Sequence, residues 1–185
     1  VDHAGNVPQP KKAPATGKSV AIIGGGPGGL SAAYYLALMG HKVTVYEQQT
    51  KLGGMMRYGI PSYRFPREKL DAEIDSILSL GIEVKTGVKV GQDVTFDQLR
   101  KEHDCLYISI GAHTDKKTGI EGEDSQGVIS AVEMLRRIGD EEMPDFTGQN
   151  VAVIGGGNVA MDVTRSAIRL GAATVSYTHL TLPTN

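Results

Sequence analysis

The feature that most constrains the fold of this chain is a glycine motif that occurs twice. Residues 19–30 read SVAIIGGGPGGL, and residues 150–161 read NVAVIGGGNVAM. In each copy, an apolar run of strand length leads into a glycine turn and then into residues with helical spacing. In this context, G-x-G-x-x-G/A is a dinucleotide-binding fingerprint. The repeat therefore predicts two strand-turn-helix units, each of which binds a dinucleotide.

The first copy contains every part of the fingerprint. Gly24 permits the tight turn, Gly26 lets the backbone approach a pyrophosphate, and Gly29 allows close packing of helix on strand. Glu47 ends the next expected strand, where an acid accepts hydrogen bonds from a ribose. The alternative is an ordinary glycine turn with a surface glutamate. Because strand, turn, helix, strand and acid occur in register, we favour nucleotide binding.

The second copy is less complete. Gly155, Gly156 and Gly157 form the turn. Ala160 stands at the position of the third glycine of the fingerprint, where alanine still allows close packing. Asn158 and Asp162 near the helix start are explained equally well by helix capping and by ligand contact. The residue that would select NADH or NADPH falls after Val175, so the sequence leaves this choice open.

The spacing of apolar residues between the two copies predicts an α/β fold. We expect helices and strands to alternate, with helices from Leu30 and from Leu70 and with strands at residues 20–23, 43–46, 82–84 and 104–110. The segment from Leu52 to Pro61 has neither helical nor strand periodicity. Its glycines Gly53 and Gly54 would let the backbone approach a flat ligand, although an ordinary loop is the alternative.

Composition excludes several other classes of function. The net charge of -2 gives no electrostatic footprint for nucleic acid, and no apolar run approaches the length of a membrane span. Residues 1–18 do not resemble a signal peptide, so we expect a cytoplasmic protein. The single cysteine, Cys105, is expected to be a buried strand residue, and the histidine spacing predicts no metal site.

Four motifs together resemble a known family. Residues 10–175 are similar to the flavin and pyridine-nucleotide region of the glutamate synthase small subunit, which dihydropyrimidine dehydrogenase and related transhydrogenase subunits share. The motifs that carry the resemblance are residues 23–30, Tyr46-Glu47 with residues 53–61, residues 104–112 and residues 153–162. One departure is that Ser109-Ile110-Gly111 stands where these enzymes often have Ala-Thr-Gly.

The fingerprints and this resemblance together define the candidate cofactor contacts. FAD contacts are expected at Gly24, Gly25, Gly26, Pro27, Gly28, Gly29, Glu47, Leu52, Gly53, Gly54, Met55, Arg64, Val90 and Gly111. The resemblance implies that Arg64 lies on the flavin side and Val90 at the adenine end. Contacts with NADPH or NADH are expected at Gly155, Gly156, Gly157, Asn158, Val159 and Asp162.

The resemblance also implies a domain order. We expect an extended linker at 1–17, a Rossmann-like FAD-binding domain at 18–126, incomplete without a later return of the chain, and the start of a Rossmann-like NAD(P)-binding domain at 127–175. Residues 176–185 are expected to be a non-native tail, because they lack the strand, charge and helix that should follow. The chain would then be a fragment that is itself inactive.

The mechanism implied by the resemblance is hydride transfer from NAD(P)H to FAD. Electrons would then pass to an iron–sulfur domain or subunit, with a glutamate synthase large subunit as a candidate partner. No catalytic side chain is expected, because the cofactors carry the chemistry. Two alternatives remain: a nucleotide-binding module without turnover, and a thioredoxin-reductase-like flavoprotein, which the absence of C-x-x-C disfavours.

Overall fold

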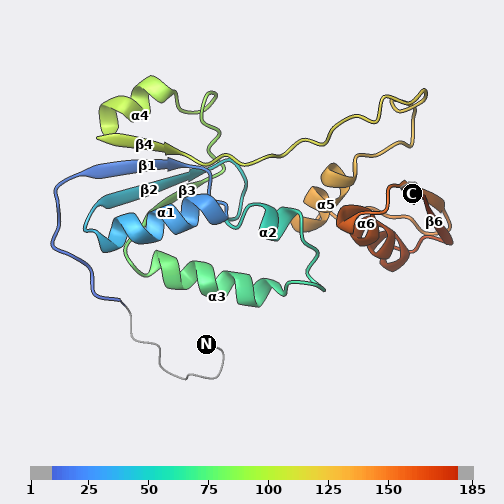
Figure 1. Cartoon of the computed structure of the whole chain (residues 1–185), viewed down its shortest axis with the longest axis horizontal. Helices are drawn as coiled ribbons and strands as arrows, with labels where there is room; N and C mark the ends of the chain where they lie inside the picture. Colours follow the sequence, from blue (N-terminus) through green and yellow to red (C-terminus); the bar gives the residue numbers. More distant parts are fainter. Residues whose placement is uncertain (1–9, 179–185) are drawn as a thin grey trace, which may run out of the picture. The chain divides into compact units, whose positions relative to one another are not determined.

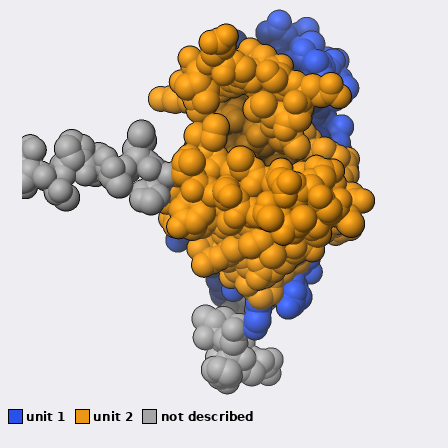
Figure 2. Space-filling model, turned by 90° about the vertical axis from the view of Figure 1, so that its right-hand side faces the viewer, with its two compact units in different colours: residues 1–54, 68–111 blue, residues 55–67, 112–185 orange. Residues whose placement is uncertain are grey.

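The computed structural model describes residues 10–178, and these divide into two compact units. Unit 1 contains residues up to 54 together with residues 68–111, and unit 2 contains residues 55–67 together with those from 112 onward. Figure 2 colours unit 1 blue and unit 2 orange. The chain therefore passes from unit 1 to unit 2 after Gly54, returns after Arg67, and passes to unit 2 again after Gly111.

Unit 1 is built on a parallel four-stranded sheet with the strand order β3-β2-β1-β4. Its helices and strands are β1 (Ser19–Ile23), α1 (Pro27–Leu38), β2 (Lys42–Glu47), α3 (Arg67–Leu78), β3 (Glu83–Thr86), α4 (Phe96–Glu102) and β4 (Cys105–Ile108). Because the chain reverses its direction across the sheet between β3 and β4, right-handed crossovers place α4 opposite α1 and α3. Figure 1 shows this arrangement.

The central strands of unit 1 are buried on both faces, as their continuous apolar sequence predicts. Ala21 and Ile23 of β1 pack with Tyr46 of β2 and Leu99 of α4 on one face. Ile22, whose side chain points to the opposite face, is fully buried as well. The reversal of strand order between β1 and β4 creates the switch point at which open α/β sheets bind ligands.

Helix α4 is an element that the periodicity of the sequence did not reveal. Its start is fixed by a capping box, in which the Thr95 side chain accepts from the Gln98 amide and the Gln98 side chain accepts from the Thr95 amide. Only Leu99 of this helix is buried. A single apolar residue gives no helical repeat, so the Thr-x-x-Gln spacing was the signal that could have predicted the helix.

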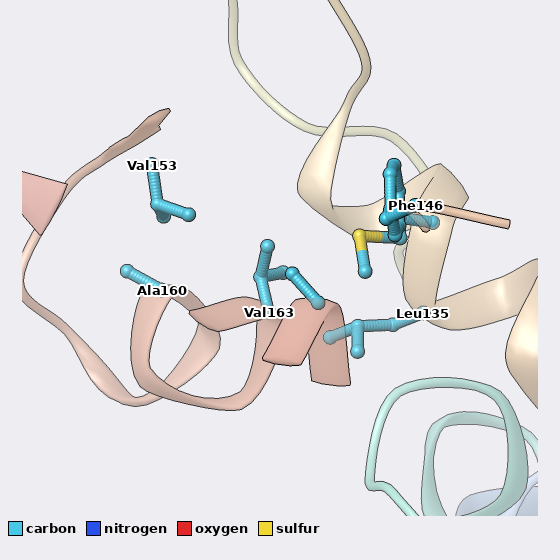
Figure 3. Packing of buried hydrophobic residues seen from close by; sticks show 7 residues of the cluster. Leu135, Phe146, Val153, Ala160 and Val163 are labelled. Atoms are coloured by element: carbon cyan, nitrogen blue, oxygen red, sulfur yellow. The ribbon is translucent and has the colours of Figure 1, made fainter. Parts of the chain in front are cut away.

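Unit 2 consists of α2 (Met55–Tyr58), α5 (Ala131–Gly139), β5 (Asn150–Ile154), α6 (Asn158–Arg169) and β6 (Thr174–Thr178). β5 and β6 pair in parallel, with Ile154 opposite Thr178. Its core joins Leu135 of α5, Phe146, Val153 of β5, and Ala160 and Val163 of α6. Figure 3 shows these side chains pointing toward one another.

Several sequence-based expectations need correction. The segment 52–61 is not only a loop, because it contains helix α2. Arg57 in that helix is only 5% exposed, although it is charged. Cys105, expected to be buried, is exposed on β4, an edge strand whose outer side lacks a neighbour in the described sheet.

The second expected strand of unit 2 continues further than the sequence indicated. β6 extends through Thr178, three residues into the segment expected to be a non-native tail. The rest of that segment, 179–185, and most of the expected linker, 1–9, lie outside the described residues. Among the helices of residues 10–178, none is long and apolar enough to cross a membrane.

Candidate dinucleotide sites

The first glycine turn lies at the end of β1, where the sheet order reverses. Gly24 has a φ of 107°, and its amide donates to the Tyr46 carbonyl at 2.8 Å. A Cβ atom at Gly24 would lie 2.4 Å from the Ser109 carbonyl oxygen. Both the backbone conformation and the neighbouring chain therefore require glycine, as the fingerprint predicts.

Glu47 connects the end of β2 to this turn through its carboxylate. Oε2 accepts from the Gly25 amide at 2.7 Å, and Oε1 accepts from the Gln49 amide at 2.8 Å. The residue is only 6% exposed. Each carboxylate oxygen can accept a second hydrogen bond, so these contacts leave capacity for a ribose hydroxyl.

Gly29 allows helix α1 to approach the turn, as its place in the fingerprint predicts. A Cβ atom there would lie 1.9 Å from the Gly24 carbonyl oxygen. Helix α1 begins at Pro27, and Gly26 before it acts as the N-cap without a side-chain hydrogen bond. An N-terminus of this kind leaves backbone amides available for an anion.

The glycine pair at 53–54 lies directly against the first turn. The Gly53 amide donates to the Gly25 carbonyl at 2.9 Å, and a Cβ atom at Gly54 would lie 2.7 Å from Gly26 Cα. Leu52 is buried, with its Cδ2 atom 2.3 Å from where a Gly25 Cβ would stand. The sequence predicted that these glycines let the backbone approach a flat ligand. The structure shows that they also lie against the backbone of the first turn.

Ser109 and Gly111 lie on the other side of the switch point, beyond β4. Ser109 Oγ lies 3.2 Å from the carbonyl oxygens of both Ile23 and Gly24 and donates a hydrogen bond there. Gly111 has a φ of 68°. Ile110, which replaces the threonine of the resembling enzymes, is 58% exposed. The polar link between β4 and the first turn is thus made by Ser109.

The second glycine turn repeats the backbone pattern of the first. Gly155 has a φ of 132°, and its amide donates to the Thr178 carbonyl at 2.8 Å, as that of Gly24 does to Tyr46. Helix α6 begins at Gly157, again without a side-chain cap. A Cβ atom at Gly157 would meet nothing within 4 Å, so its side of the turn is open. Gly156, Asn158 and Val159 are exposed beside it.

The remaining predicted contacts lie in different places. Val90 is partly buried against the α4 face of the unit 1 core. Met55 begins α2, in unit 2. Arg64, also in unit 2, has its Nε atom 3.0 Å from Oδ1 of Asp162 on α6. The structure thus joins a predicted FAD contact to a predicted nicotinamide-nucleotide contact, a pairing that sequence spacing did not indicate.

Neither site contains a cluster that would bind a metal. Within residues 10–178, no group of three or more His, Cys, Asp or Glu side chains is arranged to hold an ion. Of the histidines, His103 ends helix α4 and its Nε2 lies 3.1 Å from Tyr46 Oη. His41 Nδ1 lies 2.7 Å from Thr16 Oγ1. The chemistry of both turns is therefore that of backbone amides and one buried carboxylate.

This arrangement, with a glycine turn after a parallel strand in each unit, defines the class of dinucleotide-binding oxidoreductases. Residues 18–181 match the pyridine nucleotide-disulphide oxidoreductase family. The chain belongs to this family.

Two curated relatives confirm the resemblance found in the sequence. The chain is 49% identical, over 86% of its length, to the NADP(+)-dependent formate dehydrogenase subunit beta of Moorella thermoacetica. It is 35% identical, over 87% of its length, to the glutamate synthase [NADPH] small chain of Escherichia coli. It spans only 23% and 36% of the length of these two relatives.

The fold is also found in solved structures. FprA from Mycobacterium tuberculosis superposes with a TM-score of 0.73 over 89% of this chain and 43% of its own, at 24% identity. This likeness confirms the predicted Rossmann-like α/β class.

Proposed function

We propose that the chain is the cofactor-binding part of an NADPH-dependent FAD oxidoreductase. In this proposal, the turn at Gly24 binds FAD and the turn at Gly155 binds the nicotinamide nucleotide. The observation that carries it is the buried Glu47 carboxylate, bonded to the Gly25 amide at 2.7 Å, beside a glycine turn at a sheet switch point. The bound cofactors supply hydride transfer from nicotinamide to flavin.

The residues of the chain bind and orient the cofactors. The free amides at the start of α1 and α6 stabilise pyrophosphate charge. Glu47 accepts hydrogen bonds from the FAD ribose while it keeps the turn in place. Gly54 lies against Gly26, and neither Gly53 nor Gly54 has a side chain that would stand between this backbone and the isoalloxazine.

NADPH is the favoured reductant because relatives from several organisms are named for NADP or NADPH. They are also named as a beta subunit or a small chain. We propose accordingly that the complete protein passes electrons to an iron–sulfur domain or to a partner subunit. A cytoplasmic location fits this role.

The test is flavin reduction in the full-length protein under anaerobic conditions. After reconstitution with FAD, the protein should be yellow, and NADPH should bleach the flavin absorbance faster than NADH does. Glu47→Ala should lower FAD retention, whereas Glu73→Ala, at an exposed position on α3, should not. A full-length protein that cannot be reconstituted with FAD contradicts the proposal.

The alternative of a nucleotide-binding module without turnover gives a different result in the same experiment. Such a protein would retain FAD and bind the nicotinamide nucleotide, yet neither NADPH nor NADH would bleach it. A thioredoxin-reductase-like reaction is disfavoured, because the sequence contains one cysteine and so no C-x-x-C pair.

A further inference from the structure

The segment 55–67 is fastened to helix α6 at two points. Tyr63 Oη donates to the Asp162 carbonyl at 3.2 Å, and Arg64 Nε lies 3.0 Å from Asp162 Oδ1. Seven residues after Asp162 on α6, the Arg169 guanidinium lies 4.0 Å from the centroid of the Tyr63 ring. All these residues belong to unit 2, although the segment directly follows Gly54 of the first dinucleotide site.

Asp162 is an unusual residue to find at this position. Its side chain is only 8% exposed, and Oδ1 makes no hydrogen bond within residues 10–178, although Arg64 lies close enough to pair with its charge. Taking a carboxylate out of water costs several kcal/mol unless a partner compensates it. A fold alone is better served by an apolar residue here, so the carboxylate indicates a function.

Arg64 is placed so that its guanidinium can donate hydrogen bonds to a ligand. Its side chain is 40% exposed, and its Nε atom lies 3.0 Å from Oδ1 of the buried carboxylate. Nη1 and Nη2 make no hydrogen bond with any other residue that the structure describes. A guanidinium fixed on one edge presents its other N–H groups in a set direction, which suits an oxygen acceptor such as a phosphate or a carbonyl.

The shape of the segment is fixed independently of Asp162. The Arg67 guanidinium donates to the carbonyls of Met56, Arg57 and Ile60 at 3.0, 2.6 and 2.8 Å. Gly139 of α5 packs against Arg57 and Tyr58, since a Cβ atom there would lie 2.8 Å from the Arg57 carbonyl oxygen. Loss of the Asp162 charge should therefore release Arg64 without unfolding the segment.

We propose that Asp162 is a positioning residue that holds Arg64 toward an oxygen acceptor on a bound cofactor. Asp162 lies one helical turn after Asn158, at the start of the helix that follows the second glycine turn. The acceptor is a phosphate of the nicotinamide nucleotide, which the proposed function places at the glycine turn of the same unit. The pair would then make flavin reduction depend on α6. This inference rests on the function proposed above.

The test compares four forms of the full-length, FAD-reconstituted protein: wild type, Asp162→Asn, Arg64→Met and the double variant. Glu133→Gln is the matched control, because it removes a carboxylate that pairs with Arg136 of α5 and not with Arg64. We expect each single variant to lower the rate of flavin bleaching by NADPH about tenfold. The double variant should be no slower than Arg64→Met alone, since both changes interrupt one interaction.

The same measurements test the acceptor. If Arg64 binds a phosphate of the nucleotide, both single variants raise KM for NADPH. A merely structural pair would lower the melting temperature and FAD retention without altering KM, and that result would contradict the proposal.

Two results separate this inference from the proposed function. If wild-type protein retains FAD but NADPH does not bleach it, the proposed function fails. If wild-type protein is bleached while Asp162→Asn behaves like wild type, the positioning role alone is rejected. Effects of the two single changes that multiply in the double variant reject it as well, because residues that act independently behave in this way.

Discussion

Gly29 packs so closely on Gly24 that a Cβ atom would lie 1.9 Å from the Gly24 carbonyl oxygen. The contact is with backbone, which cannot rotate away as a side chain would. We therefore expect Gly29→Ala to destabilise unit 1 by about 3 kcal/mol or more, at the upper end of the cost of overpacking. Thermal melting of the full-length protein measures this change, and a melting temperature equal to that of wild type would contradict the packing described here.

Gly157 offers the opposite case, at the corresponding turn of unit 2. A Cβ atom there meets nothing within 4 Å, and φ is -79°, which any residue adopts. Gly157→Ala should lower the melting temperature by only a few degrees, which is the cost of alanine at the N-cap of α6, because no neighbouring atom has to move. It should raise KM for NADPH several-fold, because the methyl group occupies the side from which a pyrophosphate approaches. An unchanged KM would argue against nucleotide binding at this turn.

Glu47 should contribute to stability even without a cofactor. Its two oxygens accept from the Gly25 and Gln49 amides, so Glu47→Ala leaves both donors without that partner. Each lost partner costs about 1–3 kcal/mol where water cannot replace it. Glu47→Gln retains one acceptor oxygen and should lose less. Urea denaturation of the FAD-free protein should rank the proteins wild type, Gln and Ala, and equal stability of all three would contradict this role.

Asp104 should make unit 1 sensitive to acid. Lys18, followed by the Ser19 amide, lowers the pKa of the Asp104 carboxyl from 3.8 to about 2. Because the folded-state pKa lies below the unfolded value, the stabilisation is complete above pH 3.8 and disappears as the pH falls toward 2.

Asp104→Asn tests this effect. The variant should melt at a lower temperature than wild type near neutral pH, and the difference should shrink between about pH 4 and pH 2. Asp97→Asn, at an exposed position in the first turn of α4, serves as the control. A difference between Asp104→Asn and wild type that stays constant across this range would show that the carboxyl does not act through its charge.

The sequence predicted the α/β class and the glycine turns because both depend on local rules. Continuous apolar runs identified β1 and β5, and the fingerprint identified Gly24, Gly29 and Gly155 as positions where a side chain is excluded or strained. The family resemblance was also readable, since its motifs are short and ordered along the chain. Each strand, glycine turn or motif is encoded within about 30 consecutive residues.

Other features depended on contacts between residues far apart in the sequence. No periodicity shows that residues 55–67 belong to unit 2, that Arg57 is buried there, or that Cys105 is exposed at a sheet edge. Side-chain burial on a short element depends on what packs against it, and a local pattern does not contain that information.

The sequence by itself therefore determined the two strand-turn-helix units and the acid that ends β2. Only the tertiary structure decided that Glu47 accepts a hydrogen bond from the first glycine turn. It also decided that Arg64 forms an ion pair with Asp162, which is 98 positions later in the chain. The physical reason is that backbone geometry and hydrophobic periodicity are local, whereas the partner of a buried charge is chosen by the packing of the whole unit.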